Sequence, residues 1–106
     1  MSDCVFCKIA SGEIPGKIIH KDNQLIAFYD LFPKASVHFL IIPIQHISSM
    51  LELEEKHSKI MGDAMVLANK LAKEHGLDGY KVQVNTGASG GQEVFHLHIH
   101  VMGNKT

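Results

Sequence analysis

His96-Leu97-His98-Ile99-His100-Val101 alternates histidine with an apolar residue over six positions. A period of two is typical of a β-strand, which sends the three imidazoles to one face and Leu97, Ile99 and Val101 into the core. Neighbouring imidazoles would then be roughly 6.6 Å apart at their Cα atoms. Solvation alone does not explain three histidines in a row, because Lys, Thr or Glu would suit an exposed strand equally well. The pattern therefore predicts a site built from imidazoles.

Two kinds of chemistry use imidazoles that converge on one face. Three histidines can hold zinc and leave a position open for water, so that a chelator would abolish activity. Alternatively, one histidine attacks phosphorus while its neighbours stabilise the developing charge. The preceding segment 85–92 contains three glycines, whose backbone N–H groups can surround an anion. A long hairpin also favours glycine, but beside the histidines this loop favours a phosphate.

The remaining apolar patterns predict short strands, one short helix and one long helix. Residues 38–43 form a continuous β-rich run, as in a central strand covered on both faces. A helical repeat of apolar positions ends at Gly76. We expect an α+β fold, with a five-stranded antiparallel sheet, in one domain over residues 1–106. The predicted strands are 17–20, 25–29, 38–43, 80–86 and 94–102, and the predicted helices are 4–11 and 53–75.

Composition argues against several classes of protein. Lys and Arg number 10 against 11 Asp and Glu, so the chain lacks the basic surplus of proteins that bind polymeric nucleic acid. The longest apolar run, residues 39–42, is far shorter than the ~20 residues of a membrane span. Residues 1–3 carry no basic or apolar region of a secretion signal, which predicts a cytoplasmic protein. The 8 histidines are several times the ordinary usage.

The segment HLHIHVM at residues 96–102 resembles the histidine-triad signature of the HIT proteins, and the chain is similar to the bacterial type of the Hint branch over nearly its whole length. The resemblance implies a homodimeric HIT-like fold whose sheet continues across the dimer. It also implies that the protein binds purine nucleotides and hydrolyses nucleoside phosphoramidates, with no cofactor required for catalysis. Further matching segments are 14–15, 17–19, 27–30, 38–43, 46–48 and 90–96.

The resemblance implies a role for each of four histidines. His98 corresponds to the nucleophile that forms a covalent nucleotidyl-histidine intermediate, and His100 to the donor for a non-bridging phosphate oxygen. His96 corresponds to the imidazole that positions the nucleophile, and His38 to a fourth imidazole behind the triad. A neutral histidine is nucleophilic near pH 7 only if its other nitrogen is held as a donor, usually by a carbonyl.

The resemblance also implies the substrate contacts. Asp30 is expected to accept hydrogen bonds from the ribose hydroxyls, because one carboxylate can accept two; the alternative is that it only caps a turn before Pro33. Glu93 stands where eukaryotic members carry a small hydroxyl residue, so it is either a general acid or a spectator. The expected phosphate cradle is Asn85, Gly91, Gln92, Glu93 and Val94, and the expected base pocket is Ile18, Phe28 and Leu31, which could equally be plain core.

Two readings compete at the level of function. The first is the phosphoramidase, and the second is a nucleotide-binding sensor or adaptor that turns over slowly. Loss of His98 would be the usual mark of the second, and His98 is present. The chain also ends at Thr106, whereas the family commonly continues into a tail that shapes the choice of leaving group, so substrate preference does not transfer.

Cys4-Val5-Phe6-Cys7 has the spacing of half a structural zinc site. The resemblance to some bacterial HIT proteins implies that His46 and His96 complete this site. A redox pair is one alternative, although that motif is expected at the head of a helix that follows a strand. Two reduced cysteines without metal are the other.

A small domain gains stability by burying apolar surface in a dimer. Met61 and Met65 lie beside the apolar stripe of the long helix, and residues 80–86 predict an exposed edge strand. We therefore expect a two-fold homodimer in which the long helices pack together and the sheets join edge to edge. The alternative is that both methionines only thicken the core of one chain.

Overall fold

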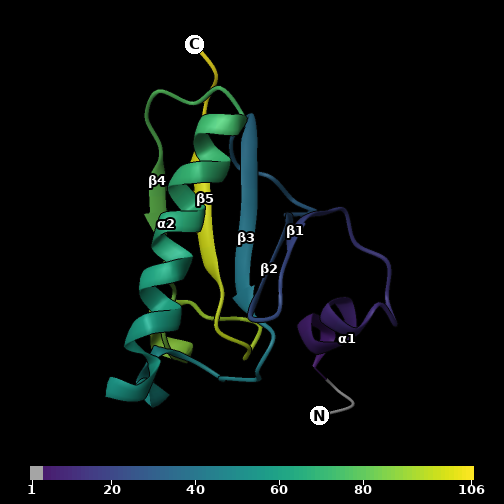
Figure 1. Cartoon of the computed structure of the whole chain (residues 1–106), viewed down its shortest axis with the longest axis vertical. Helices are drawn as coiled ribbons and strands as arrows, with labels where there is room; N and C mark the ends of the chain where they lie inside the picture. Colours follow the sequence, from purple (N-terminus) through teal and green to yellow (C-terminus); the bar gives the residue numbers. More distant parts are fainter. Residues whose placement is uncertain (1–3) are drawn as a thin grey trace.

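A computed structural model describes residues 4–106, so the expectation about residues 1–3 lies outside the described part. It contains one antiparallel sheet of five strands in the order β1-β2-β3-β5-β4 (Figure 1). This confirms the predicted α+β fold with one long and one short helix. The helices are α1 (Val5–Ser11) and α2 (Ser58–Glu74), and the strands are β1 (Ile18–Lys21), β2 (Leu25–Tyr29), β3 (Val37–Pro43), β4 (Lys81–Gln83) and β5 (Ile99–Gly103).

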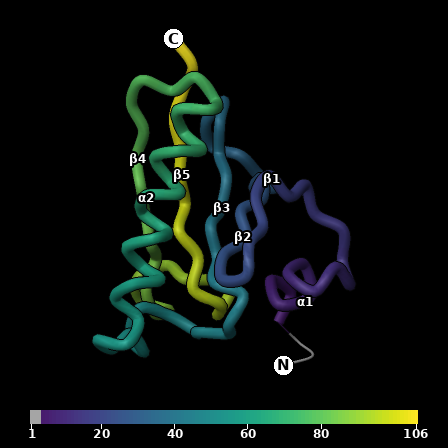
Figure 2. The backbone as a smooth tube through the Cα atoms, in the orientation of Figure 1, coloured from purple at the N-terminus to yellow at the C-terminus, as the bar shows by residue number. Residues whose placement is uncertain are grey.

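The two helices cover opposite faces of the sheet. Leu25 and Ala27 of β2 belong to the apolar cluster that includes α2, whereas Ile26 and Phe28 belong to the cluster with α1. This division follows from the alternation of side chains along a strand. Every residue of β3 is buried, which confirms the predicted central strand. The tube in Figure 2 shows α1 beside the β1–β2 end of the sheet and α2 along the other strands.

The long helix begins at Ser58, five residues later than predicted. The 3-10 turn η2 (Glu55–His57) lies in the intervening stretch, and another, η1 (Met50–Glu52), precedes it. The Glu54 backbone N–H donates to His57 Nδ1 at 2.9 Å, and this bond caps η2, which leads directly into α2. At the other end Gly76 has φ of 78°, which favours glycine and ends the helix as predicted.

The last strand is shorter than predicted, and this corrects the position of the histidine row. β5 starts at Ile99, which pairs with Ile41, so the next ladder positions would set Leu97 opposite Pro43. Proline has no N–H and cannot continue the ladder. The Leu97 N–H donates instead to the Ile47 carbonyl at 2.6 Å. As a result, residues 94–98 are not strand, and β4 likewise covers only part of the predicted 80–86.

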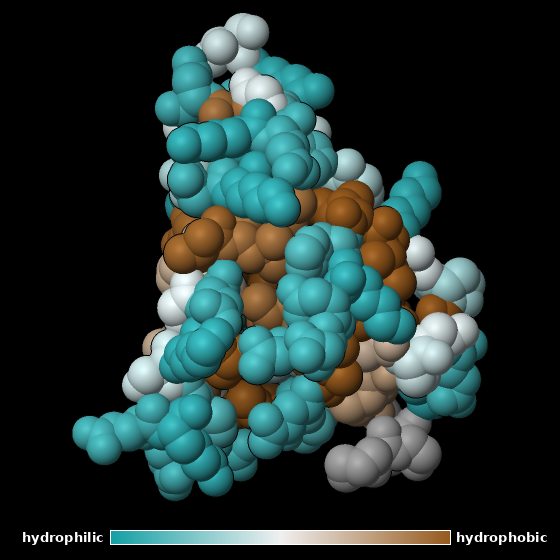
Figure 3. All heavy atoms as spheres, in the orientation of Figure 1, coloured by the Kyte–Doolittle hydropathy of each residue, from teal (hydrophilic) through white to brown (hydrophobic). Residues whose placement is uncertain are grey.

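β4 is an edge strand of the sheet, as predicted, and all three of its residues are exposed. On the long helix α2, Met65 is 41% and Val66 70% exposed. Figure 3 shows apolar surface between the polar side chains on the side of the molecule where α2 lies.

No helix within residues 4–106 is both long and apolar enough to cross a membrane.

Candidate active site and metal centre

The histidine row divides between two neighbouring sites. His98 and His100 lie side by side with ring centroids 5.0 Å apart, and the ring of His38 on β3 is 5.2 Å from that of His100. The His96 ring instead lies 4.9 Å from that of His46, toward α1. His96 and His98 are buried, although the sequence predicted an outward-facing row. Phe6 of α1 packs against both rings, with centroids 6.2 Å from His96 and 5.1 Å from His98, so the short helix covers this part of the row.

A backbone carbonyl fixes the protonation of the His98 ring. His98 Nδ1 lies 2.7 Å from the His96 carbonyl oxygen, which can only accept a hydrogen bond. Nδ1 therefore carries the proton, and the neutral ring keeps its lone pair on Nε2. Phe6 of α1 holds the same ring edge-on, with centroids 5.1 Å apart and an interplanar angle of 84°. The ring is thus oriented by both a hydrogen bond and a packing contact.

A second chain of hydrogen bonds fixes the neighbouring imidazoles. The Lys34 backbone N–H donates to His38 Nδ1 at 3.0 Å, so neutral His38 carries its proton on Nε2. Nε2 lies 3.0 Å from His100 Nδ1 and donates to it. His100 then keeps its own proton on Nε2. Burial lowers the pKa of His100 to about 4, with the charges of His98 and His38 adding to the effect. At neutral pH the two hydrogen-bonded imidazoles of His38 and His100 are uncharged, and the free donor at their end is the Nε2–H of His100.

Asp30 both caps a turn and faces the histidines. Its Oδ1 accepts the Phe32 N–H at 2.7 Å, as the turn-cap alternative predicted. Its Oδ2 lies 3.4 Å from His38 Nε2 and 4.0 Å from His100 Nδ1. Two imidazoles and a carboxylate resemble a metal site. However, His38 presents a proton rather than a lone pair to this cluster, which argues against a metal ion there.

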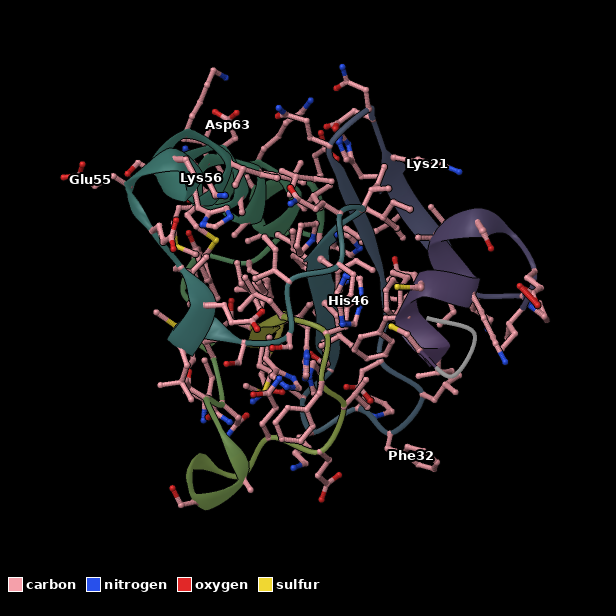
Figure 4. All side chains as sticks on the ribbon, turned by 90° about the horizontal axis from the view of Figure 1, so that it is seen from below. Lys21, Phe32, His46, Glu55, Lys56 and Asp63 are labelled. Atoms are coloured by element: carbon pink, nitrogen blue, oxygen red, sulfur yellow. The ribbon has the colours of Figure 1, made fainter. Side chains whose placement is uncertain are left out.

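The cysteines and two histidines form a second cluster, in which one ligand atom of each lies within 4.8 Å of the others. His96 Nε2 donates to the Pro43 carbonyl at 2.7 Å, which leaves the lone pair of Nδ1 for the thiols. Nδ1 lies 3.2 Å from Cys4 Sγ and 3.4 Å from Cys7 Sγ. His46 Nδ1 lies 3.3 Å from Cys7 Sγ, and Figure 4 shows His46 beside α1. Two sulfur and two imidazole donors fit tetrahedral zinc.

Protonation of the thiols also bears on this cluster. Burial raises the pKa of the Cys7 thiol to about 11, and the hydrogen bond and charge of Cys4 act in the same direction. A cation is therefore needed to hold Cys7 as a thiolate at neutral pH. Both cysteines are free rather than joined in a disulfide.

The glycine-rich loop before the histidines is closed by its own side chains. Asn85 Nδ2 donates to the Gly90 carbonyl at 2.9 Å, so this amide supports the loop. Gly87 and Gly91 have φ of 74° and 87°, a conformation that favours glycine. Gln92 is buried, Glu93 is exposed, and Val94 packs against the α1 cluster. The residues of the predicted phosphate cradle thus differ in exposure, and Asn85 and Gly91 belong to the loop that this hydrogen bond closes.

The three residues expected to form a base pocket differ in exposure. Phe28 is 4% exposed and belongs to the α1 cluster, in agreement with the plain-core alternative. Ile18 is 41% and Leu31 82% exposed, so neither is core. Leu31 follows Asp30 directly, which brings an exposed apolar side chain next to the carboxylate.

Sequence reasoning missed three groups that orient the imidazoles. They are the Phe6 ring, the Lys34 N–H and the Pro43 carbonyl. Phe6 had a signal, because it lies between Cys4 and Cys7 and had to approach His96 if the cysteines did. The other two are backbone groups, whose partners do not depend on the identity of the side chain.

Comparison with known proteins gives concordant matches. A family model described as the scavenger mRNA decapping enzyme C-terminal binding domain matches residues 3–106. Protein HitA of Neisseria gonorrhoeae is 45% identical over 104 residues, which are 97% of each chain. The structure of a HIT family hydrolase from Legionella pneumophila has a TM-score of 0.95 and 40% identity, covering 98% of this chain and 95% of that one.

A third match is a zinc-bound histidine triad family protein from Mycobacterium smegmatis, with a TM-score of 0.86 and 29% identity. It covers 99% of this chain and 77% of that one. The fold, the triad and these relatives agree over nearly the full length of the chain. The chain therefore belongs to the histidine triad (HIT) family, and its relatives include bacterial HIT hydrolases.

Proposed function

We propose that this HIT protein hydrolyses phosphoramidates of purine nucleoside monophosphates through a covalent nucleotidyl-histidine intermediate on His98. The observation that carries the proposal is the hydrogen bond from His98 Nδ1 to the His96 carbonyl at 2.7 Å. It reserves Nε2 as a nucleophile at neutral pH. The His100 ring lies beside the His98 ring, and its Nε2–H can stabilise negative charge on the phosphate oxygens.

In the first step His98 Nε2 attacks the α-phosphorus, the phosphorus–nitrogen bond breaks, and the amine leaves with a proton from solvent or Glu93. The His100 Nε2–H donates to a non-bridging oxygen throughout. The His96 carbonyl stabilises the positive charge that develops on the His98 ring. In the second step water attacks phosphorus and releases a proton to solvent, the bond to His98 breaks with its electron pair returning to Nε2, and the nucleoside monophosphate leaves the neutral ring.

The groups around the triad suit the rest of a nucleotide. Asp30 Oδ2 is the oxygen that the turn does not use, so we assign it to the ribose hydroxyls. The N–H groups of Gly91 and Gln92 donate to carbonyls within the loop, so those of Glu93 and Val94 are the ones we assign to the phosphate. Ile18 and Leu31 offer exposed apolar surface for the base. The contact of Asp30 Oδ2 with His38, at 3.4 Å, supports the assignment of the ribose.

Zinc in the Cys4, Cys7, His46 and His96 cluster would supply a structural cross-link between α1 and the residues before β5. No catalytic step runs through it. The three-histidine zinc hydrolase is disfavoured, because both ring nitrogens of His96 point to groups other than His98 and His100. The cluster and the triad thus have separate tasks.

Turnover of a fluorogenic adenosine phosphoramidate tests the proposal. His98→Ala should lower the rate by at least ~10³-fold and leave AMP binding within about tenfold of wild type, because the ribose and base contacts remain. Comparable turnover by the variant would overturn the assignment of the nucleophile. A wild type that binds AMP without measurable turnover would favour the sensor alternative instead.

A further inference from the structure

Gln92 is a buried glutamine in the segment that precedes the histidines. Its side-chain amide uses all its hydrogen-bonding capacity except one lone pair of Oε1. The residue is 5% exposed. Its Oε1 accepts the Gly87 N–H at 2.9 Å. Its Nε2 donates to the Ser48 carbonyl at 2.7 Å and to the Val94 carbonyl at 3.0 Å. A buried amide satisfied in this way is held in one orientation.

These partners lie on three different segments. Gly87 begins the glycine-rich loop, and Val94 lies on the stretch that leads to the histidines. Ser48 follows His46 on the segment between β3 and η1. Along the chain Gln92 and Ser48 are 44 residues apart. One side chain therefore joins the loop, the approach to the triad and the segment that carries a candidate metal ligand.

The loop has few other supports. Within the described residues, the remaining hydrogen bonds of residues 87–91 stay inside the segment 85–92, as in Gly90 N–H to Gly87 and Gly91 N–H to Ala88. Residues 88–91 are exposed. A loop closed only on itself can move as a unit relative to its surroundings. The bonds of Gln92 to Ser48 and Val94 oppose that movement.

We propose that Gln92 is a positioning residue that fixes the end of the glycine-rich loop, so that the N–H groups of Glu93 and Val94 that follow it receive the phosphate of the nucleotide. This inference rests on the proposed function. It gives Gln92 a role through its side chain, whereas the resemblance implied only a place in the phosphate cradle. The side chain does not reach the substrate, because its polar atoms are already paired within the protein.

Gln92→Met tests the proposal, since it keeps the length of the side chain and removes all three hydrogen bonds. Gln24→Met, at an exposed glutamine beside the β1–β2 turn, is the matched control. Affinity for AMP and for adenosine is measured by titration calorimetry, and turnover with the fluorogenic adenosine phosphoramidate. Adenosine lacks the phosphate and reports on the ribose and base contacts alone.

For Gln92→Met we expect AMP affinity to fall at least about tenfold while adenosine affinity stays within about threefold of wild type. KM should rise with kcat nearly unchanged, because the N–H groups of Glu93 and Val94 hold the phosphate in the ground state and the transition state alike. Unchanged AMP affinity, or an equal loss for AMP and adenosine, would overturn the inference. A wild type that binds no AMP would instead count against the proposed function.

Amide hydrogen exchange in the wild-type protein tests the same point without a variant. The Gly87 N–H should exchange much more slowly than the amides of Ala88 and Ser89, because only the first is bonded to a buried side chain. Similar exchange rates for the three amides would contradict the positioning role of Gln92 even if Gln92→Met did not fold.

Discussion

Individual backbone groups assign the role of each imidazole. The His96 carbonyl leaves His98 Nε2 with the lone pair that our proposed nucleophile needs, and the Lys34 N–H turns His38 into a donor toward His100. The Pro43 carbonyl turns the lone pair of His96 toward the cysteines. Chemically identical rings thus acquire different tasks from the hydrogen bond that each accepts or donates.

Acid should destabilise the protein through His100. Burial lowers the pKa of this ring to about 4 from its ordinary 6.5. The unfolded chain therefore takes up a proton as pH falls through 6.5, and the folded chain does so only near pH 4. The free energy of unfolding should decrease across this interval, and His100→Asn should flatten the decrease. Urea denaturation between pH 7.5 and 4.5, with a chelator present throughout, measures both slopes.

Part of the acid dependence should remain in the variant, because burial also lowers the pKa of His38 and His96. His20 serves as a control for replacing a histidine outside the site, since its partner Asp22 lies at the β1–β2 turn. His20→Asn should leave the effect of His100→Asn unaltered. Equal slopes for wild type and His100→Asn would show that the ring titrates normally.

At the scale of elements, the cysteine cluster attaches α1 to the rest of the fold. Chelation with EDTA should lower the melting temperature by at least about 5 °C but have a smaller effect on the rate per folded molecule. The reason is that a closed site of this kind stabilises structure rather than taking part in catalysis. Calorimetry and turnover on the same samples make the comparison. A Cys7→Ser variant should respond much less to EDTA, and elemental analysis that finds no zinc in protein purified without chelator would remove the idea.

The contact between β5 and the turn after α2 leaves no room for a side chain at Gly103. A Cβ there would lie 2.8 Å from Leu77 Cδ1 and 2.9 Å from the Gly79 carbonyl. Gly103→Ala should cost about 1–3 kcal/mol of unfolding free energy, since the carbonyl cannot move aside as a flexible side chain can. Gly79→Ala, which meets nothing within 4 Å, should stay within about 0.5 kcal/mol. Equal losses in urea denaturation would refute this packing.

The sequence predicted those elements whose apolar side chains repeat in a pattern that follows directly from how the element is buried. The all-apolar run of β3 and the helical repeat of Ala64, Ala68 and Leu71 are examples. It could not predict where β5 begins, because that depends on a missing N–H on the neighbouring strand at Pro43. The α2 start was also missed, since the 3-10 turn η2, which Glu54 and His57 cap, takes the place of the first predicted helical turn.

For the candidate site, the sequence named the imidazoles but not their states. Alternation brought His98 and His100 together, and the resemblance supplied His38. The donors and acceptors that fix each ring are backbone groups distant in the chain, such as the Pro43 carbonyl, 53 residues from His96. The bond from Gln92 to Ser48 is of the same kind, because nothing in the intervening sequence marks the pairing.

The whole molecule should be a two-fold dimer. Met65 and Val66 on α2 and Val82 on the edge strand β4 leave apolar surface exposed on a small chain. Met61 packs against the core, in agreement with the core alternative for that residue. Light scattering at micromolar concentration should give about twice the chain mass of 11.7 kDa.

Met65→Glu should shift this dimer toward the monomer, because it places a charge in the expected contact between long helices. Lys70→Gln changes the net charge of the same helix by an equal amount and should leave the mass unchanged. A wild-type monomer at micromolar concentration would refute the dimer, and an unaffected Met65→Glu dimer would remove the helix contact.

The covalent intermediate on His98 is the central claim, and rapid quenching followed by mass spectrometry tests it most directly. Enzyme mixed with an adenosine phosphoramidate and quenched in base during turnover should gain the mass of one adenylyl group. Peptide mapping should find that group on the peptide containing His98, and His98→Ala should show none. Turnover without an adduct under these conditions, or an adduct at another residue, would contradict the account.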